Sequence, residues 1–390
     1  MPYAQYLFFI LALASMLTQF GNVRASVEGR ELRLFGVLFF LLFGVVIISA
    51  ISGLTPFYGA KLAVILLITT LPFILTALLV FNHPPKVFLV PLFLVGLVSA
   101  VGATFLAWYG PVNIGGVGII NYLHGNRWSF LYQEANGLGW AIAVSITTLL
   151  YFVIDAKSVA LRLFYLFILL PFLLFVFWKT NSRASTLWLA WSFLVFGMAS
   201  LCFMYRMLES PRGFWKIIGL LSLVIIGIVS YMAYEKIYGF MRLGQGDITS
   251  GRFQVWVQYW QQFQENPLLG FGFGATKTFL EGQPVLSPLN VFIGMLGESG
   301  LLGFLLLLIL WVRGFFSSVK IVFAELSEQG RNLNLALWVL AMLGGIALQQ
   351  NGEWHIMRVS PLHYLFFFVV TIAWALGEKR LVEGASSYER

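Results

Sequence analysis

Long apolar runs alternate with short polar connections along the whole chain. Eleven of these runs are long enough to cross a bilayer, which takes about 20 apolar residues, with a range of roughly 17–25. Lipid offers no partner to a backbone amide, so we expect each run to be a helix. The expected spans are 3–20, 34–53, 62–80, 87–108, 136–154, 163–178, 186–204, 217–234, 291–312, 334–350 and 362–377.

This pattern predicts an all-α integral membrane protein, a polytopic bundle of about 11 transmembrane helices, within bounds of about 10–12. Runs of about ten alternating polar and apolar residues, which would indicate a membrane barrel, do not occur. We expect residues 1–390 to form a single transmembrane domain, with one large external loop at 235–290.

Charge predicts the orientation of the bundle. One alternating set of connections carries 15 of the 24 Lys and Arg residues: 21–33, 81–86, 155–162, 205–216, 313–333 and 378–390. The other set carries nine, four of them in the long segment 235–290. Cytoplasmic loops are enriched in Lys and Arg, so the first set is predicted to be cytoplasmic. The N-terminus is then outside and the C-terminus inside.

Composition agrees with a membrane protein and excludes a soluble one. Charged residues make up 10% of the chain, against about 25% for soluble domains, and the mean hydropathy is +0.87. The net charge of +8 comes from loop residues that orient the chain, so it does not indicate a nucleic-acid partner. With one cysteine, Cys202, an intrachain disulfide is impossible.

The long external segment contains an amphipathic pattern. Five apolar residues recur at helical spacing: Phe253, Trp256, Val257, Trp260 and Phe263. Glutamines fill much of the remaining surface, which predicts a helix of about four turns. Ser250 is the expected N-cap and Asn266-Pro267 the expected stop. The helix either packs on the roof of the bundle or dips into lipid, and it presents Arg252 in its first turn.

Three external arginines fall in short polar motifs: Asn126-Arg127-Trp128, Asn181-Ser182-Arg183-Ala184 and Ser250-Gly251-Arg252-Phe253. Membrane chains avoid cations on the translocated side unless they have a role there. The motifs therefore indicate binding of an anionic, pyrophosphate-linked lipid. For Arg183 taken alone, the alternative is a helix-end side chain that reaches the lipid interface.

These motifs occur in an order that resembles the O-antigen ligase and polymerase superfamily. Asn126-Arg127 is followed by Glu134-Ala135-Asn136-Gly137, then by Asn181-Ser182-Arg183-Ala184. Ser250-Gly251-Arg252 precedes Asn266-Pro267-Leu268-Leu269-Gly270-Phe271-Gly272-Phe273-Gly274, and Leu289-Asn290 precedes Gly300-Leu301-Leu302-Gly303. The resemblance covers residues from about 120 to 310, and segment 250–303 is its most specific part.

The resemblance implies a GT-C-like glycosyltransferase of the bacterial inner membrane, with its N-terminus in the periplasm. It implies that Arg127, Arg183 and Arg252 hold the pyrophosphate of an undecaprenyl-pyrophosphate-linked glycan donor on the periplasmic face. The acceptor is another lipid-linked repeat for a polymerase of O-antigen or exopolysaccharide, and lipid A core for a ligase. It also implies no metal and no cofactor, and a chain-length regulator protein is a further expected partner besides membrane lipids.

One departure separates the two activities. Ligases carry a His directly before the Asn of the fourth motif, where this chain has Leu289. A leucine side chain cannot accept a proton, so this position favours a polymerase over a ligase.

The candidates for a general base lie mainly in the polar segment 349–358. We assign Glu353 or His355 to this role, and Arg358 as a further pyrophosphate ligand. The alternative is a solvated turn in which Arg358 anchors to lipid phosphate. His363, on an apolar helix, is expected to be a buried bundle histidine.

Other polar residues have two interpretations each. Asn290 contacts sugar or caps the following helix, and Glu134 and Asn136 are candidate glycan ligands. Glu298 lies inside a predicted span, where a charge at the bilayer centre costs about 2.5–3.5 kcal/mol. It serves either structural hydrogen bonding or acid–base chemistry.

The remaining acidic residues argue against a metal-dependent reaction. The chain has only two aspartates, Asp155 and Asp247, and its outer carboxylates are scattered. A lipid flippase or transporter is the competing class of function. It is disfavoured because a transporter needs polar residues along a central cavity, and here the spans are nearly free of charge.

Overall fold

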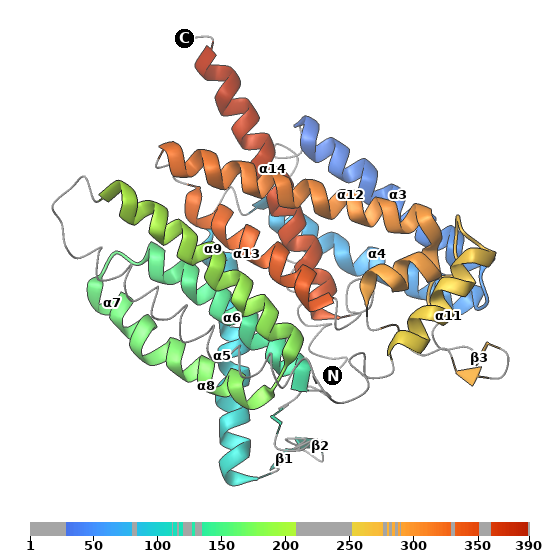
Figure 1. Cartoon of the computed structure of the whole chain (residues 1–390), viewed down its shortest axis with the longest axis horizontal. Coiled ribbons are helices and arrows are strands. Elements are labelled where there is room, and N and C mark those ends of the chain that lie inside the picture. Colours follow the sequence, from blue (N-terminus) through green and yellow to red (C-terminus); the bar gives the residue numbers. More distant parts are fainter. Residues whose placement is uncertain are drawn as a thin grey trace. The chain divides into compact units, whose positions relative to one another are not determined.

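The computed structural model describes residues 29–79, 84–110, 112–114, 117–119, 127–128, 135–207, 252–275, 279–280, 283–284, 288, 290–328, 332–350 and 360–388. Within these ranges, eight helices are long and apolar enough to cross a membrane, and a shorter apolar helix covers Leu362–Glu378. The chain is an all-α polytopic membrane protein, as the sequence predicts (Figure 1).

The described chain forms two compact units, each assembled from segments far apart in the sequence. The first unit comprises residues 1–83, 244–321 and 350–390. Its helices are α3 (Arg30–Ser52), α4 (Pro56–Leu79), α11 (Arg252–Glu265), the first part of α12 (Val291–Glu328) and α14 (Pro361–Tyr388). Helices α3, α4 and α14 pack against one another.

The second unit comprises residues 84–243 and 322–349. Its helices are α5 (Lys86–Tyr109), α6 (Ala135–Asp155), α7 (Val159–Phe164), η1 (Tyr165–Leu169), α8 (Leu170–Thr180), α9 (Arg183–Met207) and α13 (Leu333–Gln350). Helix α6 packs against α5, α8 and α9 and is therefore buried along most of its length.

Two short antiparallel ladders complete the described structure. Strand β1 (Val112–Ile114) pairs with β2 (Val117–Ile119), and β3 (Phe279–Leu280) pairs with β4 (Gln283–Pro284). Each ladder joins neighbouring segments, so neither changes the helical architecture.

A π-turn joins α7 to α8, so that 159–180 forms one span. Pro171 has no N–H to donate to the helical ladder. Just before it, the N–H of Leu170 bonds to the carbonyl of Tyr165, five residues back. The π-turn η1 lets the helix pass the proline without ending.

Nine of the eleven predicted spans coincide with helices, and the other two, 3–20 and 217–234, lie outside the described residues. Two of the predicted connections contain further helix that was not predicted: α12 continues through 313–328 and α14 through 378–388. In the α12 extension, Ser318, Ile321, Val322 and Glu325 are buried at helical spacing. That period was present in the sequence, but Lys320 and Glu325 within it made the stretch read as a polar connection.

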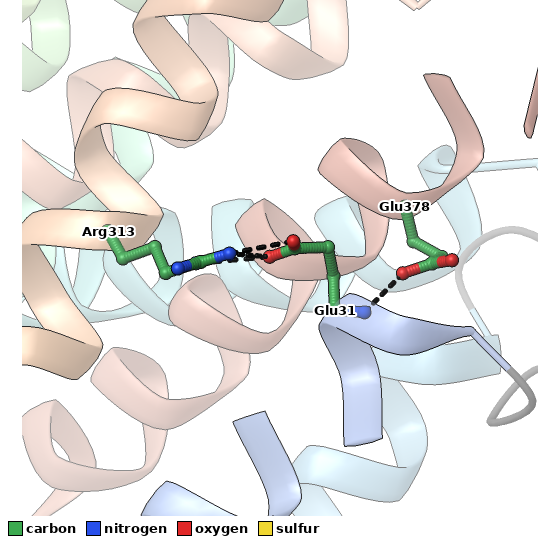
Figure 2. Close-up of polar contacts among 3 residues, drawn as sticks. All are labelled: Glu31, Arg313 and Glu378. Carbon is green, nitrogen blue, oxygen red and sulfur yellow. Dashed lines mark hydrogen bonds and ion pairs between the residues drawn. The ribbon is translucent and has the colours of Figure 1, made fainter. Parts of the chain in front are cut away.

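Figure 2 shows a polar cluster that ties together three helices of the first unit. Arg313 of α12 binds Glu31 of α3 through both carboxylate oxygens, with Nη2–O distances of 2.7 Å. The Glu31 backbone N–H donates to Glu378 of α14 at 2.5 Å, which caps the start of α3. The Arg313 guanidinium also lies 5.1 Å from the centre of the Trp374 ring.

The cluster supports the predicted alternation of the connections. Glu31, Arg313 and Glu378 all come from segments predicted to share one side of the membrane. In the second unit, Lys86 and Asp155 come from two more segments of that set, and they form a 2.7 Å ion pair. That this side is the cytoplasmic one remains a prediction from charge.

Helix α12 is interrupted at Gly300, which has a left-handed backbone (φ 63°). The interruption leaves the carbonyls of Gly297 and Glu298, and the amides of Leu301 and Leu302, without partners in the helix. The loop that follows α11 supplies all four partners. The amides of Phe271 and Gly272 donate to the first two, at 2.9 and 3.2 Å, and the carbonyls of Pro267 and Leu268 accept from the last two, at 2.8 and 3.4 Å.

Glycine is required where the two backbones meet. A Cβ at Gly300 would lie 2.3 Å from the carbonyl group of Leu268, and a Cβ at Gly270 would lie 2.2 Å from the carbonyl oxygen of Gly297. Both residues also have positive φ angles. Small residues such as glycine let another segment approach a membrane helix closely. The structure shows that a loop makes the approach at Gly300.

We predict that Gly300→Ala strongly destabilises the protein. A side chain would be strained at this φ by about 1–3 kcal/mol and would also collide with the Leu268 backbone. Gly44→Ala in α3 is the matched control, because a Cβ there meets nothing within 4 Å and alanine favours a helix. Thermal unfolding in detergent checks the pair. Equal melting temperatures for the two variants would contradict a requirement for glycine where the loop after α11 bonds to the backbone of α12.

Candidate functional site

Several polar contacts of the second unit meet at the corner between α8 and α9, residues 180–183. Helix α8 ends at Thr180, and Asn181 follows in the left-handed conformation (φ 49°, ψ 37°). Asparagine is among the few non-glycine residues that adopt this conformation readily. The chain therefore turns within two residues, and α9 begins at Arg183 with an exposed side chain.

Arg127 is fixed to this corner by hydrogen bonds. Its Nε donates to the carbonyl of Thr180 at 3.0 Å, and its Nη2 donates to the carbonyl of Asn181 at 3.2 Å. Nη2 also donates to Oδ1 of Asn136 in the first turn of α6, at 2.9 Å. The first two sequence motifs, about 50 residues apart, thus meet at one point. Carbonyls at a helix C-terminus attract cations, so the contact also stabilises the end of α8.

Trp128 completes the docking of the first motif. Its backbone N–H donates to the carbonyl of Lys179 at 3.0 Å, and its indole packs edge-on against Phe175 at 6.0 Å. Lys179 extends over the same Phe175 ring, 5.6 Å from its centre. Tryptophan in the Asn-Arg-Trp motif therefore holds the arginine in place.

Beneath the corner lies a line of buried polar side chains. The hydroxyls of Ser182 and Ser185 are 2.8 Å apart, and Ser185 donates to Oε1 of Gln349 at the end of α13 at 3.0 Å. Gly139 of α6 lets Ser182 approach closely, since a Cβ there would lie 2.5 Å from the serine Cβ. These contacts fix the start of α9 against both α6 and α13.

The corner is electropositive. Arg127, Lys179 and Arg183 gather around it, and the described residues that form it include no Asp or Glu. The first amides of α9 add the partial positive charge of a helix N-terminus. The arrangement suits an anion with several oxygens, such as a phosphate group.

The first unit carries the third motif. Arg252 is the first residue of α11, and its side chain lies outside the described part of the structure. Helix α11 ends at Glu265, as Asn266-Pro267 predicts. The glycine loop, residues 266–274, then turns tightly, with φ angles of 68° at Gly270, 113° at Gly272 and 82° at Gly274.

Glu298 anchors this glycine loop from inside the unit. Its side chain is fully buried, and its Oε2 accepts the backbone N–H of Gly274 at 3.1 Å. Its carbonyl accepts the Ser49 hydroxyl at 2.6 Å, and that hydroxyl in turn accepts the N–H of Phe273 at 3.2 Å. The contacts support the structural interpretation of Glu298.

Asn290 and His363 have structural contacts. Oδ1 of Asn290 accepts the amides of Phe292 and Ile293 at 2.9 and 3.2 Å, so Asn290 caps α12. The ring Nε2 of His363 lies 2.6 Å from the Thr70 hydroxyl, and the residue is fully buried. His363 is therefore the buried bundle histidine that the sequence predicts.

Several predicted site residues lie outside the described residues. They are Glu134, Leu289, Glu353, His355 and Arg358, together with the expected N-cap Ser250. Their roles stay predictions. Within the described ranges, no three His, Cys, Asp or Glu side chains lie together in a way that could hold a metal ion.

Sequence reasoning missed two contributors to the corner. The carbonyl of Thr180 carries no sequence signal, because any residue could supply it. Ser185 did carry one. It follows Ser182 by three residues, which places both hydroxyls on one face of a helix that starts at Arg183.

Residues 166–308 match the family model described as O-antigen ligase. The match includes Arg183, Arg252 and the glycine loop, and it confirms the resemblance to the O-antigen ligase and polymerase superfamily over that segment. A search of curated proteins finds no matching relative.

We predict that Glu298→Gln retains stability and activity, whereas Glu298→Ala loses both. Glutamine keeps an oxygen that can accept the Gly274 N–H, and alanine leaves this buried donor unpaired, at about 1–3 kcal/mol. Melting temperature and glycan transfer are measured for each variant. A folded but inactive Glu298→Gln protein would instead indicate acid–base chemistry.

Proposed function

We propose that this chain, which matches the O-antigen ligase family over residues 166–308, is a glycosyltransferase that polymerises lipid-linked glycans. The donor and acceptor are oligosaccharide repeats carried on undecaprenyl pyrophosphate. Transfer takes place on the periplasmic face of the inner membrane, and arginines rather than a metal ion hold the pyrophosphate.

The observation that carries this proposal is the meeting of two arginine motifs at the α8–α9 corner. Arg127 bonds to Asn136 and to the carbonyl of Asn181, two residues before the exposed Arg183. Arg183 adds an exposed guanidinium to the start of α9, where the helix dipole already supplies positive charge. The corner is therefore suited to receive an anion.

The chemistry needs fixed positive charge at the leaving group. Transfer breaks the bond between the anomeric carbon and the phosphate oxygen, and negative charge grows on the pyrophosphate as the bond breaks. Preorganised cations near that oxygen lower the barrier, because they need no reorientation during the reaction. Arginine suits this role, since its planar fork binds two phosphate oxygens and stays charged near lipid. In this proposal Arg183 and Arg252 bind the pyrophosphate directly, with Arg358 as a further ligand.

The acceptor hydroxyl must lose a proton as it attacks. Glu353 and His355 follow Gln349 by four and six residues in the sequence, and Gln349 is bonded to the corner through Ser185. They remain our candidates for the general base. Asn136 and Glu134 are the candidate glycan contacts at the start of α6. Since Asn136 already binds Arg127, its role would include orienting that arginine.

The alternative within the same chemistry is a ligase that transfers the glycan to lipid A core or another acceptor. Leu289, where ligases carry a histidine, favours the polymerase. A flippase is less well supported, because it would need polar residues along a central cavity, and several hydroxyls buried in the described spans, such as those of Ser318 and Thr371, are bonded within their own helices.

We predict that Arg183→Ala abolishes glycan extension while the protein still folds and inserts. Arg30→Ala is the matched control, because Arg30 also begins a helix with an exposed side chain. Its segment is predicted from charge to lie on the opposite side of the membrane from Arg183. Polymer length on gels and protein level in membranes are measured together. Normal polymer from Arg183→Ala would refute the pyrophosphate clamp at this corner.

Lysine at the same position refines this test. We expect Arg183→Lys and Arg252→Lys to recover little activity, because a point charge cannot replace the bidentate fork. Full activity in both lysine variants would indicate simple charge attraction instead.

We predict that the purified protein lengthens defined lipid-linked repeats in the absence of lipid A core. The reaction is followed by mass spectrometry of the lipid-linked products, with the Arg183→Ala protein as the blank. Products that appear only when lipid A core is supplied would reverse the choice and identify a ligase.

A further inference from the structure

The buried face of helix α11 is not the apolar stripe of its sequence pattern. Val255 and Tyr259 are buried, with 8% and 2% of their surface exposed. Tyr259 packs edge-on against Phe271 of the glycine loop at 5.3 Å and lies over Gly297 of α12, where a Cβ would be 2.5 Å from its ring. These contacts hold α11 to the first unit.

The predicted apolar stripe is instead largely exposed. Phe253, Val257 and Trp260 expose 61%, 38% and 51% of their surface, and their i, i+4, i+7 spacing places them in one row. The remaining face is polar and also exposed: Gln254, Gln258, Gln261 and Glu265. The helix therefore has three faces, of which one is packed, one is apolar and open, and one is polar and open.

An apolar groove runs beside the open stripe. It has a volume of about 240 Å³ and is lined by Phe253, Trp256, Val257, Tyr259, Trp260, Ile293 and Leu296. Ile293 and Leu296 belong to the first two turns of α12, the start of a membrane span. The groove therefore lies at the depth where that span enters the membrane.

We propose that α11 lies in the interface of the bilayer, with Phe253, Val257 and Trp260 immersed among the hydrocarbon chains of its lipids. Lipid is the occupant that fits, because the groove borders the first two turns of a membrane span. Further along α12, Leu301, Leu302, Leu305 and Ile309 are 39–44% exposed, as expected of side chains in contact with acyl chains. Water is a poor occupant for an apolar row of this size.

The rest of the helix fits this position. A helix with a separate apolar and polar face lies in the plane of the interface, and tryptophan is favoured at that level. The indole N–H of Trp256 is satisfied within the protein, since it donates to the carbonyl of Pro288 at 2.7 Å. The polar face of three glutamines and Glu265 can remain in the headgroup water.

This placement of α11 has a consequence for Arg252 that rests on the proposed function. Arg252 begins α11, so a helix held in the interface keeps Arg252 at the level of lipid phosphates. The pyrophosphate of a lipid-linked donor lies at that same level, because its isoprenoid is in the membrane. The bilayer itself would then set the height of a substrate-binding residue.

Spin labels at single cysteines test the placement. In a Cys202→Ser background, which removes the sole native cysteine, labels are attached to Val257→Cys and Trp260→Cys. The neighbours Gln258→Cys and Gln261→Cys are matched controls, one residue further along the same helix. In lipid nanodiscs, we expect the ratio of oxygen to nickel-chelate accessibility to be several-fold higher at 257 and 260 than at 258 and 261.

Two outcomes would overturn the proposal. Equal ratios at all four positions would mean that the stripe faces water, and labels at 257 and 260 shielded from both reagents would mean that protein covers it. Neither outcome depends on catalysis. The proposed function is tested separately by Arg183→Ala, so the two can fail independently.

Discussion

A backbone amide or carbonyl inside a membrane has no water to bind, and each one left unpaired costs several kcal/mol. The break at Gly300 would expose four such groups in α12. Their partners come from residues 267–272, so the break can exist only while the glycine loop is in place. The loop follows α11 directly, and the position of α11 is thereby tied to the transmembrane ladder through backbone bonds. Side-chain packing alone would fix the position of α11 less tightly.

The same constraint gives Arg127 a double role. Its guanidinium binds carbonyls at the end of α8, where the last carbonyls of a helix have no partner within the helix. Removing Arg127 would therefore disturb the corner as well as any bound anion, and loss of activity in Arg127→Ala would not separate the two effects. Arg183 is exposed and begins its helix, and its side chain takes no part in the bonds of Arg127 to Thr180, Asn181 and Asn136. Mutational evidence for anion binding is thus clearest at Arg183.

Hydrophobic run length was sufficient to predict the helices, because the bilayer imposes both helix formation and a minimum length. Every predicted span that falls in the described residues is a helix. The prediction failed where that constraint ends: residues 313–328 and 378–388 continue as helices beyond the predicted spans, and there ordinary helix period rather than hydropathy carries the signal. For α11, the sequence identified the helix and its end but left open whether its apolar stripe packs on the bundle or meets lipid. An apolar stripe marks a face that avoids water, and in a membrane protein lipid satisfies that requirement as well as a core does.

The candidate site was predictable in its residue types and less so in its contacts. The rare external arginines identified the corner, because cations are costly on the translocated side of a membrane chain. Asn136 was predicted as a site residue, and the structure places it against Arg127. Backbone partners such as the Thr180 carbonyl could not be predicted, since they depend on the path of the chain. Asn290 shows the opposite limit: its amide suits either a sugar or a helix cap, and the structure shows that its oxygen caps α12. Its amide nitrogen is not used by the cap, so capping can orient Asn290 for a ligand without replacing that role.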